Sequence, residues 1–381
     1  MSRQLWWVEV GAVLEDGSVR GFSIGMAALL EDLGSDQAPK GWAGSTSDLA
    51  RAARLKQTLA VQQARGGSLE EACDSVSGVV RIYRRLSKSE PARYHPELAL
   101  ALTAWGLWSS RLARREEAAA ALSGAVELYR ELVARHSRLR VMHRIRLRVG
   151  MAVALSNLGL ARSELGEHDA ATAAAEESIL TLRRLHAHNA LYRMLSRSNP
   201  VGFEHCLAAA LNNFGLVLAA RGDLDQACEL AQETTDSYRR LAGLAPVVFE
   251  SELARALHNL GLAAAEVGRL DTALAATQES VYLHRFLAPA DPVGHRQQLG
   301  RALCAFAQVR AACGLDLTEA LAAAEEAVTL HEGLTAAQPQ AFSGDLHAAY
   351  RTVAQVRAAR ARGTEGPAQP AGDDPDRDPA T

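Results

Sequence analysis

Three regularities in the 381-residue sequence predict an all-α solenoid, in which helix-turn-helix units stack along the chain. A glycine or alanine, here called the marker, recurs at intervals of 46 to 56 residues. A turn residue, mostly glycine, follows seven residues after the marker, and a small residue follows five residues after the turn. A fixed period of this kind is typical of repeat proteins, in which each unit buries its apolar face against its neighbours. The markers are Ala60, Gly106, Gly159, Gly215, Gly261, Ala307 and Ala354.

Each unit is predicted to contain a first helix, a turn and a second helix. Over residues 253–266 the apolar residues recur on one helical face, and Arg255 and His258 lie away from it. The turn glycine can adopt a positive φ and end the first helix, and an acidic residue such as Asp223 suits the start of the second helix. The small marker lets the neighbouring backbone approach closely.

The segments between one unit and the next contain a proline, and an aromatic residue often follows it; these segments are residues 90–102, 245–257, 290–303 and 338–350. We expect the proline to end the preceding helix and a long linker to follow it. The aromatic residue is expected to fill the seam between the units. Two insertions, in residues 135–149 and 186–206, lengthen the central intervals, and we expect them to extend helices.

The ends of the chain differ from the repeats, which extend over residues 49–362. Residues 1–48 are predicted to form an N-terminal cap or linker. Within them, residues 4–24 alternate as in a short β-hairpin; the alternative is that a tryptophan pair covers the first helices. Residues 363–381 are rich in proline, glycine and aspartate, which predicts a disordered acidic tail.

Composition excludes several classes of protein. The formal net charge is −3, so the chain has no overall basic field, and we expect no nucleic-acid partner. No apolar run reaches the length of about 18 residues that a membrane span needs, and the N-terminal residues lack the pattern of a secretory signal. The five cysteines are scattered without a CxxC pair, as in a reducing compartment. We therefore expect a cytoplasmic location.

Three consecutive repeats share a fuller pattern of a leucine or phenylalanine before the marker glycine and two later small or hydroxyl residues. These residues are Leu158-Gly159, Ala171 and Ser178; Phe214-Gly215, Ala227 and Thr234; and Leu260-Gly261, Ala273 and Ser280. The pattern resembles tetratricopeptide repeats, especially the long-repeat type also seen in kinesin light chains and many bacterial regulatory proteins. The resemblance covers residues 49–362 and implies a right-handed superhelix. It also implies that the first helices line a concave groove that binds peptides or protein segments.

An asparagine stands two residues before the marker in three successive repeats, at Asn157, Asn213 and Asn259, and Asn212 adjoins the second. The resemblance implies that this position faces the groove. Because an amide offers both a donor and an acceptor, a row of asparagines can hold the backbone of an extended peptide without demanding its sequence. The alternative is that each asparagine fixes the adjacent helix turn.

Charged residues supply further candidates. Arg255 and His258 lie close to Asn259 in sequence, and we expect them to tune specificity. Clustered arginines can bind carboxylates or phosphates, which makes a basic cluster a candidate contact for an acidic partner. The alternative is a solvated helix whose arginines pair with nearby glutamates. The cluster consists of Arg138, Arg140, Arg144, Arg146 and Arg148.

The sequence contains no recognisable catalytic motif. The GxSxG elbow in its proper context, the phosphate-binding loop and the dinucleotide fingerprint are all missing. His186, His188 and His205-Cys206 lack the spacing of metal ligands. We therefore expect no enzyme activity, no metal and no cofactor. A helical-repeat enzyme with a site in residues 135–206 is the remaining catalytic alternative.

The sequence predicts a protein- or peptide-binding scaffold or adaptor that works in signalling. The alternative is a sensor or regulatory region that works with a separate effector module, such as a transcriptional regulator or a nucleotide-switch protein. Self-association through residues 340–362 is a further expectation, because a solenoid end without a polar cap exposes apolar surface.

Overall fold

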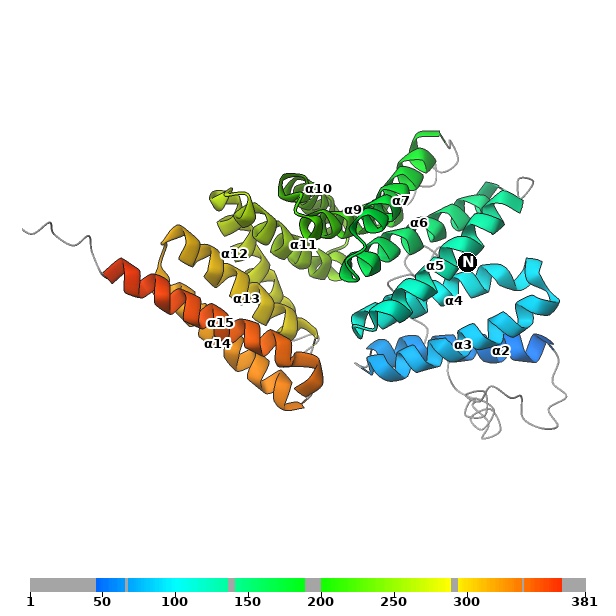
Figure 1. The fold of residues 1–381 in the computed structure, drawn as a ribbon, viewed down its shortest axis with the longest axis horizontal. Helices are drawn as coiled ribbons and strands as arrows, with labels where there is room; N and C mark the ends of the chain where they lie inside the picture. The colour runs from blue at the N-terminus through cyan, green and yellow to red at the C-terminus, as the bar shows by residue number, and fades with distance from the viewer. Residues whose placement is uncertain are drawn as a thin grey trace, which may run out of the picture. The chain divides into compact units, whose positions relative to one another are not determined.

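All regular secondary structure in the described part of the chain is α-helical, which confirms the predicted all-α fold (Figure 1). The predicted hairpin over residues 4–24 lies outside the described residues, as does nearly all of the predicted segments 1–48 and 363–381. The computed structural model describes residues 46–65, 68–135, 141–188, 200–288, 294–337 and 339–364.

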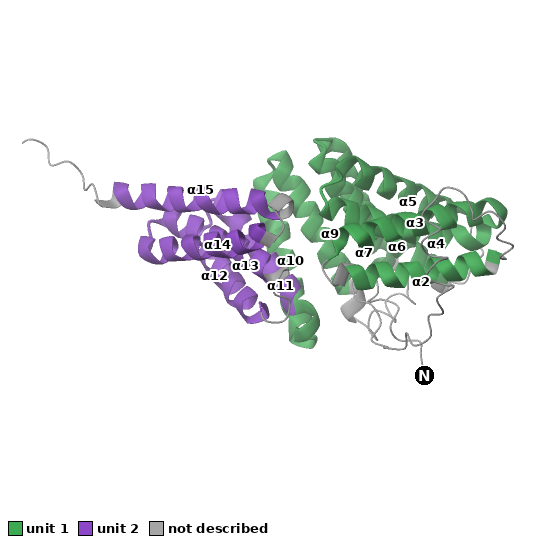
Figure 2. Cartoon of the chain, turned by 90° about the horizontal axis from the view of Figure 1, so that it is seen from below, with its two compact units in different colours: residues 1–249 green, residues 250–381 purple. Residues whose placement is uncertain are grey.

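The chain divides into two compact units, Met1–Phe249 and Glu250–Thr381, called unit 1 and unit 2 (Figure 2). The described helices of unit 1 are α2 (Thr46–Arg65), α3 (Leu69–Ser89), α4 (Pro91–Arg111), α5 (Arg115–Arg135), α6 (Val141–Glu164), α7 (His168–His188), α9 (Pro200–Arg221) and α10 (Leu224–Leu244). Unit 2 holds most of α11 (Pro246–Glu266), followed by α12 (Leu270–Leu287), α13 (Gly294–Cys313), α14 (Leu317–Ala337) and α15 (Pro339–Thr364).

Helices that follow one another along the chain pack in pairs, and the pairs stack within each unit. The first helices of the repeats are α2, α4, α6, α9, α11, α13 and α15, and the second helices are α3, α5, α7, α10, α12 and α14. First helices of successive repeats also contact each other, as α6 does with α9 and α13 with α15. Within the described residues no second helix follows α15, so the last predicted repeat is a single helix.

The turns between paired helices have the backbone conformation predicted for glycine. Gly166, Gly222, Gly268 and Gly314 have φ values between +65° and +96°, a region that glycine enters at little cost. Ala113 takes the equivalent place in an earlier repeat, with a φ of +56°. For a residue with a Cβ atom this conformation costs roughly 1–2 kcal/mol.

The markers lie where the first and second helices of a pair approach closely. A Cβ atom on Gly159 would lie 3.0 Å from the carbonyl oxygen of Ala171, and one on Gly261 would lie 2.4 Å from Cγ2 of Thr277. Gly215 is looser, because the nearest atom would be 3.5 Å away. The predicted link between the marker and the later small residue is therefore a direct contact between two helices.

A serine in the second helix joins the two helices of a pair through a hydrogen bond. The hydroxyl of Ser178 donates to the carbonyl of Ala152 at 2.6 Å, and that of Ser280 donates to the carbonyl of Ala254 at 2.8 Å. Both carbonyls belong to residues seven positions before the marker, so the bond repeats in register. Each such bond contributes about 1 kcal/mol to stability.

The prediction of long linkers between repeats is wrong where the structure describes these segments. A single residue, Glu90, separates α3 from α4, and Ala245 alone separates α10 from α11. The reason is that proline is well suited to the first turn of a helix, where its missing N–H has no intrahelical partner. Pro91 and Pro246 therefore begin the next helix, besides ending the previous one.

The aromatic residues after these prolines are buried, as predicted. Tyr94 and Phe249 expose 1% and 4% of their surface. The Tyr94 ring lies 6.3 Å from the ring of Tyr83, which belongs to the preceding second helix. The Phe249 ring lies 5.4 Å from that of His205. These contacts confirm the expectation that an aromatic residue fills the seam between successive repeats.

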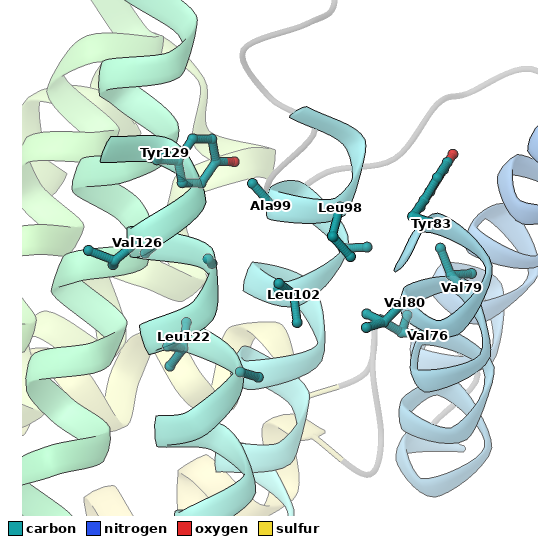
Figure 3. Close-up of a cluster of buried hydrophobic side chains, with 14 of the residues drawn as sticks. Val76, Val79, Val80, Tyr83, Leu98, Ala99, Leu102, Leu122, Val126 and Tyr129 are labelled. Atoms are coloured by element: carbon teal, nitrogen blue, oxygen red, sulfur yellow. The ribbon is translucent and has the colours of Figure 1, made fainter. Parts of the chain in front are cut away.

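The core of unit 1 is formed by apolar side chains from both helices of each pair. Figure 3 shows Val76 and Val80 of α3 near Leu102 of α4, and Leu122 and Val126 on the next second helix. The described part of the 135–149 insertion begins α6, which reaches 24 residues, so the prediction that this insertion extends a helix is confirmed there.

The acidic residue at the start of α10 lies where it was predicted, at the positive end of the helix dipole, but it forms no capping hydrogen bond. Asp223 occupies the N-cap, but its side chain makes no capping hydrogen bond. It pairs instead with Arg221 across the turn, with Nε and Oδ2 3.0 Å apart. A side-chain bond of the predicted kind is present at α14, where Asp316 accepts from the backbone N–H of Glu319 at 3.1 Å.

The last helix carries a polar exposed surface. Arg351, Arg357, Arg360 and Arg362 of α15 are all exposed, and Tyr350 is the large apolar side chain among them, with 49% exposure. The marker Ala354 is exposed because no second helix covers it in the described residues. Self-association through residues 340–362 stays a prediction, and its premise of a missing polar cap is not met by this helix.

Replacing two marker glycines of unit 1 by alanine should have opposite effects. At Gly106 the new Cβ would lie 2.5 Å from Cγ of the buried Leu122 and 3.1 Å from the carbonyl oxygen of Ala118. We expect Gly106→Ala to destabilise unit 1 by about 1–3 kcal/mol through overpacking. Gly215→Ala, the matched control, should be neutral or stabilising by up to about 1 kcal/mol, because alanine favours the helix.

Chemical unfolding followed by tryptophan fluorescence measures both variants, since Trp105 and Trp108 lie in α4. Equal destabilisation by the two substitutions would contradict the role assigned to the close contact.

Candidate functional site

The predicted asparagines lie on first helices, and all four are half-buried. Asn157 lies on α6 and Asn212 and Asn213 on α9, within unit 1, whereas Asn259 lies on α11 in unit 2. Because α6 packs against α9, the structure brings the first three close together.

The amides of unit 1 form a hydrogen-bonded chain between two first helices. Asn213 donates from Nδ2 to the hydroxyl of the buried Ser156 at 3.1 Å, which links α9 to α6. Asn212 donates to Oδ1 of Asn213 at 3.4 Å. Asn157 donates to the carbonyl of Val153, one turn earlier in its own helix, at 2.8 Å. At least one function of Asn157 and Asn213 is therefore structural, as in the alternative that each asparagine fixes the adjacent helix turn.

A row of leucines runs beside the asparagines and was missed in the sequence. Leu160 and Leu216 follow the markers by one residue and the asparagines by three, so each shares a helical face with its asparagine. Leu107 occupies the same position on α4. Leu160 and Leu107 are half-buried, and Leu216 is 37% exposed. In the sequence, a leucine directly after each marker glycine indicates this row. The helical face that carries the asparagines therefore offers apolar contacts as well as amide groups.

Unit 2 presents charged side chains on the corresponding helices. Arg255 is exposed and forms an ion pair with Glu252 on its own helix α11. Arg301 of α13 binds Asp345 of α15 through two hydrogen bonds, from Nε to Oδ1 at 2.9 Å and from Nη2 to Oδ2 at 3.0 Å. Gln297 donates to the same carboxylate at 2.8 Å. This network between two first helices was not predicted, because its members have no fixed sequence spacing.

The ionisation of Asp345 follows from these contacts. Burial alone would raise the pKa of its carboxyl group, but the hydrogen bonds from Arg301 and Gln297 outweigh that effect and lower the pKa. The carboxylate is therefore ionised at neutral pH and holds α13 and α15 together. Bidentate pairs of this kind are stronger than single contacts.

Two histidines adjoin this network. His331 of α14 is 1% exposed, and its Nε2 lies where a side chain on Gly300 of α13 would be. Burial lowers its pKa. Burial, and then the charge of Arg301, lower the pKa of His258 to about 4. His258 was predicted to tune specificity, yet its Nδ1 atom is buried without a hydrogen-bond partner among the described residues.

The basic cluster is only partly on the asparagine face of α6. Arg138 and Arg140 lie outside the described residues. Arg146 precedes Asn157 by eleven residues, or about three helical turns, so it lies on the same face and is exposed. Arg148 precedes Asn157 by nine residues, or about two and a half turns, and lies on the other side. Arg144, four residues before Arg148, shares that other side.

The described residues contain no cluster of histidine, cysteine and acidic side chains that could hold a metal ion. The His205 ring packs edge-on against Tyr238 and at a tilt against Phe249, with centroids at 6.0 and 5.4 Å, and so belongs to the packing of unit 1. None of the described helices is both long and apolar enough to cross a membrane.

A shallow hollow lies between α5, α6 and α7, on the side of the second helices. Its volume is about 160 Å³, and the ion pair between Arg130 and Glu177 is part of its lining, with Nη2 and Oε2 2.6 Å apart. Small-molecule sites commonly have volumes of about 300–1,000 Å³. The hollow is therefore small for a substrate or cofactor.

The repeat geometry and the comparison with known families agree. Residues 207–246, which include most of α9 and all of α10, match the tetratricopeptide repeat family. Residues 207–246 thus match the repeat family that the sequence pattern resembles, and the other described helix pairs have the same helix-turn-helix form. No curated protein matches the chain.

Three solved structures are similar to this chain at low sequence identity. BtubC (BKLC) from P. vanneervenii is 17% identical, with a TM-score of 0.43, over 80% of this chain and 96% of that one. A Rap protein in complex with competence and sporulation factor is 12% identical, with a TM-score of 0.48, over 83% and 80%. The Rap conjugation gene regulator of plasmid pLS20, in complex with the Phr* peptide, is 12% identical, with a TM-score of 0.48, over 87% and 81%.

Replacing Asn213 should test its structural bond. Asn213→Ala removes the donor to Ser156 and leaves a buried hydroxyl without this partner, so we expect unit 1 to lose about 1 kcal/mol of stability. Asn157→Ala is the matched control at the same repeat position, because the bond from Asn157 to Val153 stays within one helix, and we expect a smaller loss. Urea unfolding of both variants measures the difference, and equal losses would contradict the role of the α6–α9 bond.

Stability of unit 2 should fall as the pH drops below neutral. The pKa of His258 is about 4 in the folded chain and about 6.5 when unfolded, so between these values the unfolded chain binds a proton that the folded chain does not. Stability is therefore lost as the pH falls through this window, by up to about 2 kcal/mol at pH 5 for His258. The lowered pKa of His331 acts in the same direction.

Hydrogen exchange of peptides from α11 to α15 at pH 7 and pH 5, corrected for the intrinsic pH effect, measures this loss. The control is His258→Gln/His331→Gln, for which the pH dependence should shrink. A variant with the full dependence of the parent protein would show that other groups cause it.

Proposed function

We propose that this chain binds an extended peptide or protein segment along the first helices of its repeats, and that it does so without catalysis. The single observation that carries the proposal is the recurrence of a half-buried asparagine at one repeat position, in Asn157, Asn213 and Asn259. Within unit 1, the neighbouring amides of Asn157 and Asn213 match the donors and acceptors that an extended backbone presents, and Asn259 offers the same group within unit 2.

The leucines beside the amides support the same ligand. Leu160 and Leu216 offer apolar contact next to Asn157 and Asn213. An extended segment can therefore place its backbone on the amides and alternate side chains on the leucines. Arg146, on the same face of α6, is the member of the basic cluster best placed to contact an acidic residue of the ligand.

The chemistry of the face favours a binding protein over an enzyme. Asp345 is neutralised by Arg301, and the low pKa of His258 keeps this side chain uncharged at neutral pH. Burial, and to a smaller extent the charge of Asp345, raise the pKa of the nearby Cys304 thiol, so this thiol is not activated for catalysis at neutral pH. None of the five cysteines, which all lie in the described part of the chain, forms a disulfide bond, and this supports our further proposal of a cytoplasmic location.

A triple substitution tests the proposal. Peptides are first selected from a display library on the purified full chain, and their binding is then measured by fluorescence anisotropy. Asn157→Ala/Asn213→Ala/Asn259→Ala should weaken binding roughly 100-fold, since three lost hydrogen bonds at about 1 kcal/mol each amount to about 3 kcal/mol.

The matched control changes three exposed residues on second helices, Arg184→Ala/Gln226→Ala/Glu229→Ala. It should bind like the parent protein, and circular dichroism should show equal helicity in all three proteins. Selected peptides that bind the asparagine variant and the parent equally would move the binding site away from the first helices.

A further inference from the structure

The second helix α12 carries two exposed aromatic side chains that the repeat does not require. Tyr282 is 70% exposed and Phe286 is 66% exposed. They lie four residues apart, on one face of the helix. Gln278, one turn before Tyr282, is exposed on the same face.

The other second helices serve as an internal comparison. The positions that follow the small residue of the second helix by nine and thirteen are exposed in every described repeat. At these positions the other five second helices have polar, charged or small residues, with Leu180 of α7 as the exception. In chain order, the residues at these two positions of the other second helices are Arg81 and Arg85, Glu127 and Glu131, Leu180 and Arg184, Asp236 and Arg240, and Thr329 and Gly333. Neither packing within the repeat nor the turn therefore explains the aromatic pair of α12.

We propose that Tyr282 and Phe286 form a dimer contact with α12 of a second copy of this chain, related by a twofold axis. Burial of exposed aromatic surface is favourable, and tyrosine is enriched among the residues that dominate interfaces. An antiparallel crossing with the twofold axis near Tyr282 places the Tyr282 rings of the two copies against each other, and each Phe286 ring beside Gln278 of the other copy.

The charges around Tyr282 are complementary to themselves under this symmetry. Glu279 precedes Tyr282 by three residues, and Arg285 follows it by three. A twofold axis near Tyr282 therefore brings Glu279 of one copy opposite Arg285 of the other. A surface that pairs with its own copy must be self-complementary in this way. Arg285 also binds Glu326 of α14, which orients its side chain at the edge of the patch.

The size of the patch sets the strength of the contact. A buried aromatic side chain covers roughly 150–250 Å², so four rings account for about 600–1,000 Å². This lies at the low end for specific interfaces. We therefore expect a weak dimer that forms with rising concentration, with a micromolar dissociation constant.

The contact leaves the candidate peptide site unoccupied, because that site lies on first helices and α12 is a second helix. The two proposals are therefore independent. Loss of peptide binding in the asparagine variant should leave dimerisation unchanged, and loss of dimerisation should leave peptide binding to each chain unchanged.

Sedimentation velocity on the full chain tests the dimer, over concentrations from about 1 to about 300 μM, a range in which a weak interface becomes populated. The parent protein should shift from monomer to dimer. Tyr282→Glu/Phe286→Glu should raise the dissociation constant at least about tenfold. Both residues are exposed, so helicity and melting should not change.

Leu180→Glu is the matched control, because Leu180 is exposed at the position of α7 that corresponds to Tyr282. It should dimerise like the parent protein. A parent protein that stays monomeric throughout would overturn the proposal. A dimer that the double variant retains at full strength would also overturn it, since the contact would then lie elsewhere.

Discussion

The close contact between the two helices of each repeat is the constraint on which the rest of the structure depends. At Gly159 and Gly261 there is no room for a side chain, because the second helix lies against the backbone of the first. This spacing also brings the hydroxyls of Ser178 and Ser280 within hydrogen-bonding distance of carbonyls in the first helix. A larger marker would separate the helices and lengthen these bonds at the same time. The turn glycines reverse the direction of the chain between the two helices, whose separation is set by the contact at the marker.

Because the repeat constrains buried positions and leaves exposed ones free, its two units present different surfaces on equivalent helices. In unit 1 the first helices carry amides and leucines, and the bond from Asn213 to Ser156 joins two of them. In unit 2 the bond between Arg301 and Asp345 joins first helices through charge. Amides and leucines can exchange internal contacts for contacts with a ligand at little cost, whereas a partly buried ion pair resists separation. The first helices of unit 1 are therefore better suited to a peptide backbone.

The sequence predicts structural features that recur in several repeats, but it does not predict contacts that occur in one repeat only. Markers, turns and the seam aromatic Tyr94 repeat along the chain, so each occurrence supports the others. The prediction of long linkers was wrong because a proline such as Pro91 both ends one helix and begins the next. The bond from Asn213 to Ser156 joins residues 57 positions apart, which only the packing of α6 on α9 reveals. The burial of His258 likewise depends on neighbours outside its own helix, so spacing within 253–266 could not predict it.

The internal bonds of the asparagines do not conflict with a role in binding. Asn157 and Asn213 each use an N–H within the protein, which holds the amide in one orientation before any ligand arrives. A side chain that is already ordered loses less conformational entropy when it binds a peptide. The amide carbonyl of Asn157 can then accept from a peptide N–H while the donor side keeps its internal partner. Oδ1 of Asn213 already accepts from Asn212, and its second lone pair can accept from the peptide. The internal bonds of the asparagines are therefore compatible with the proposed peptide contact, because they position the amides on which that proposal rests.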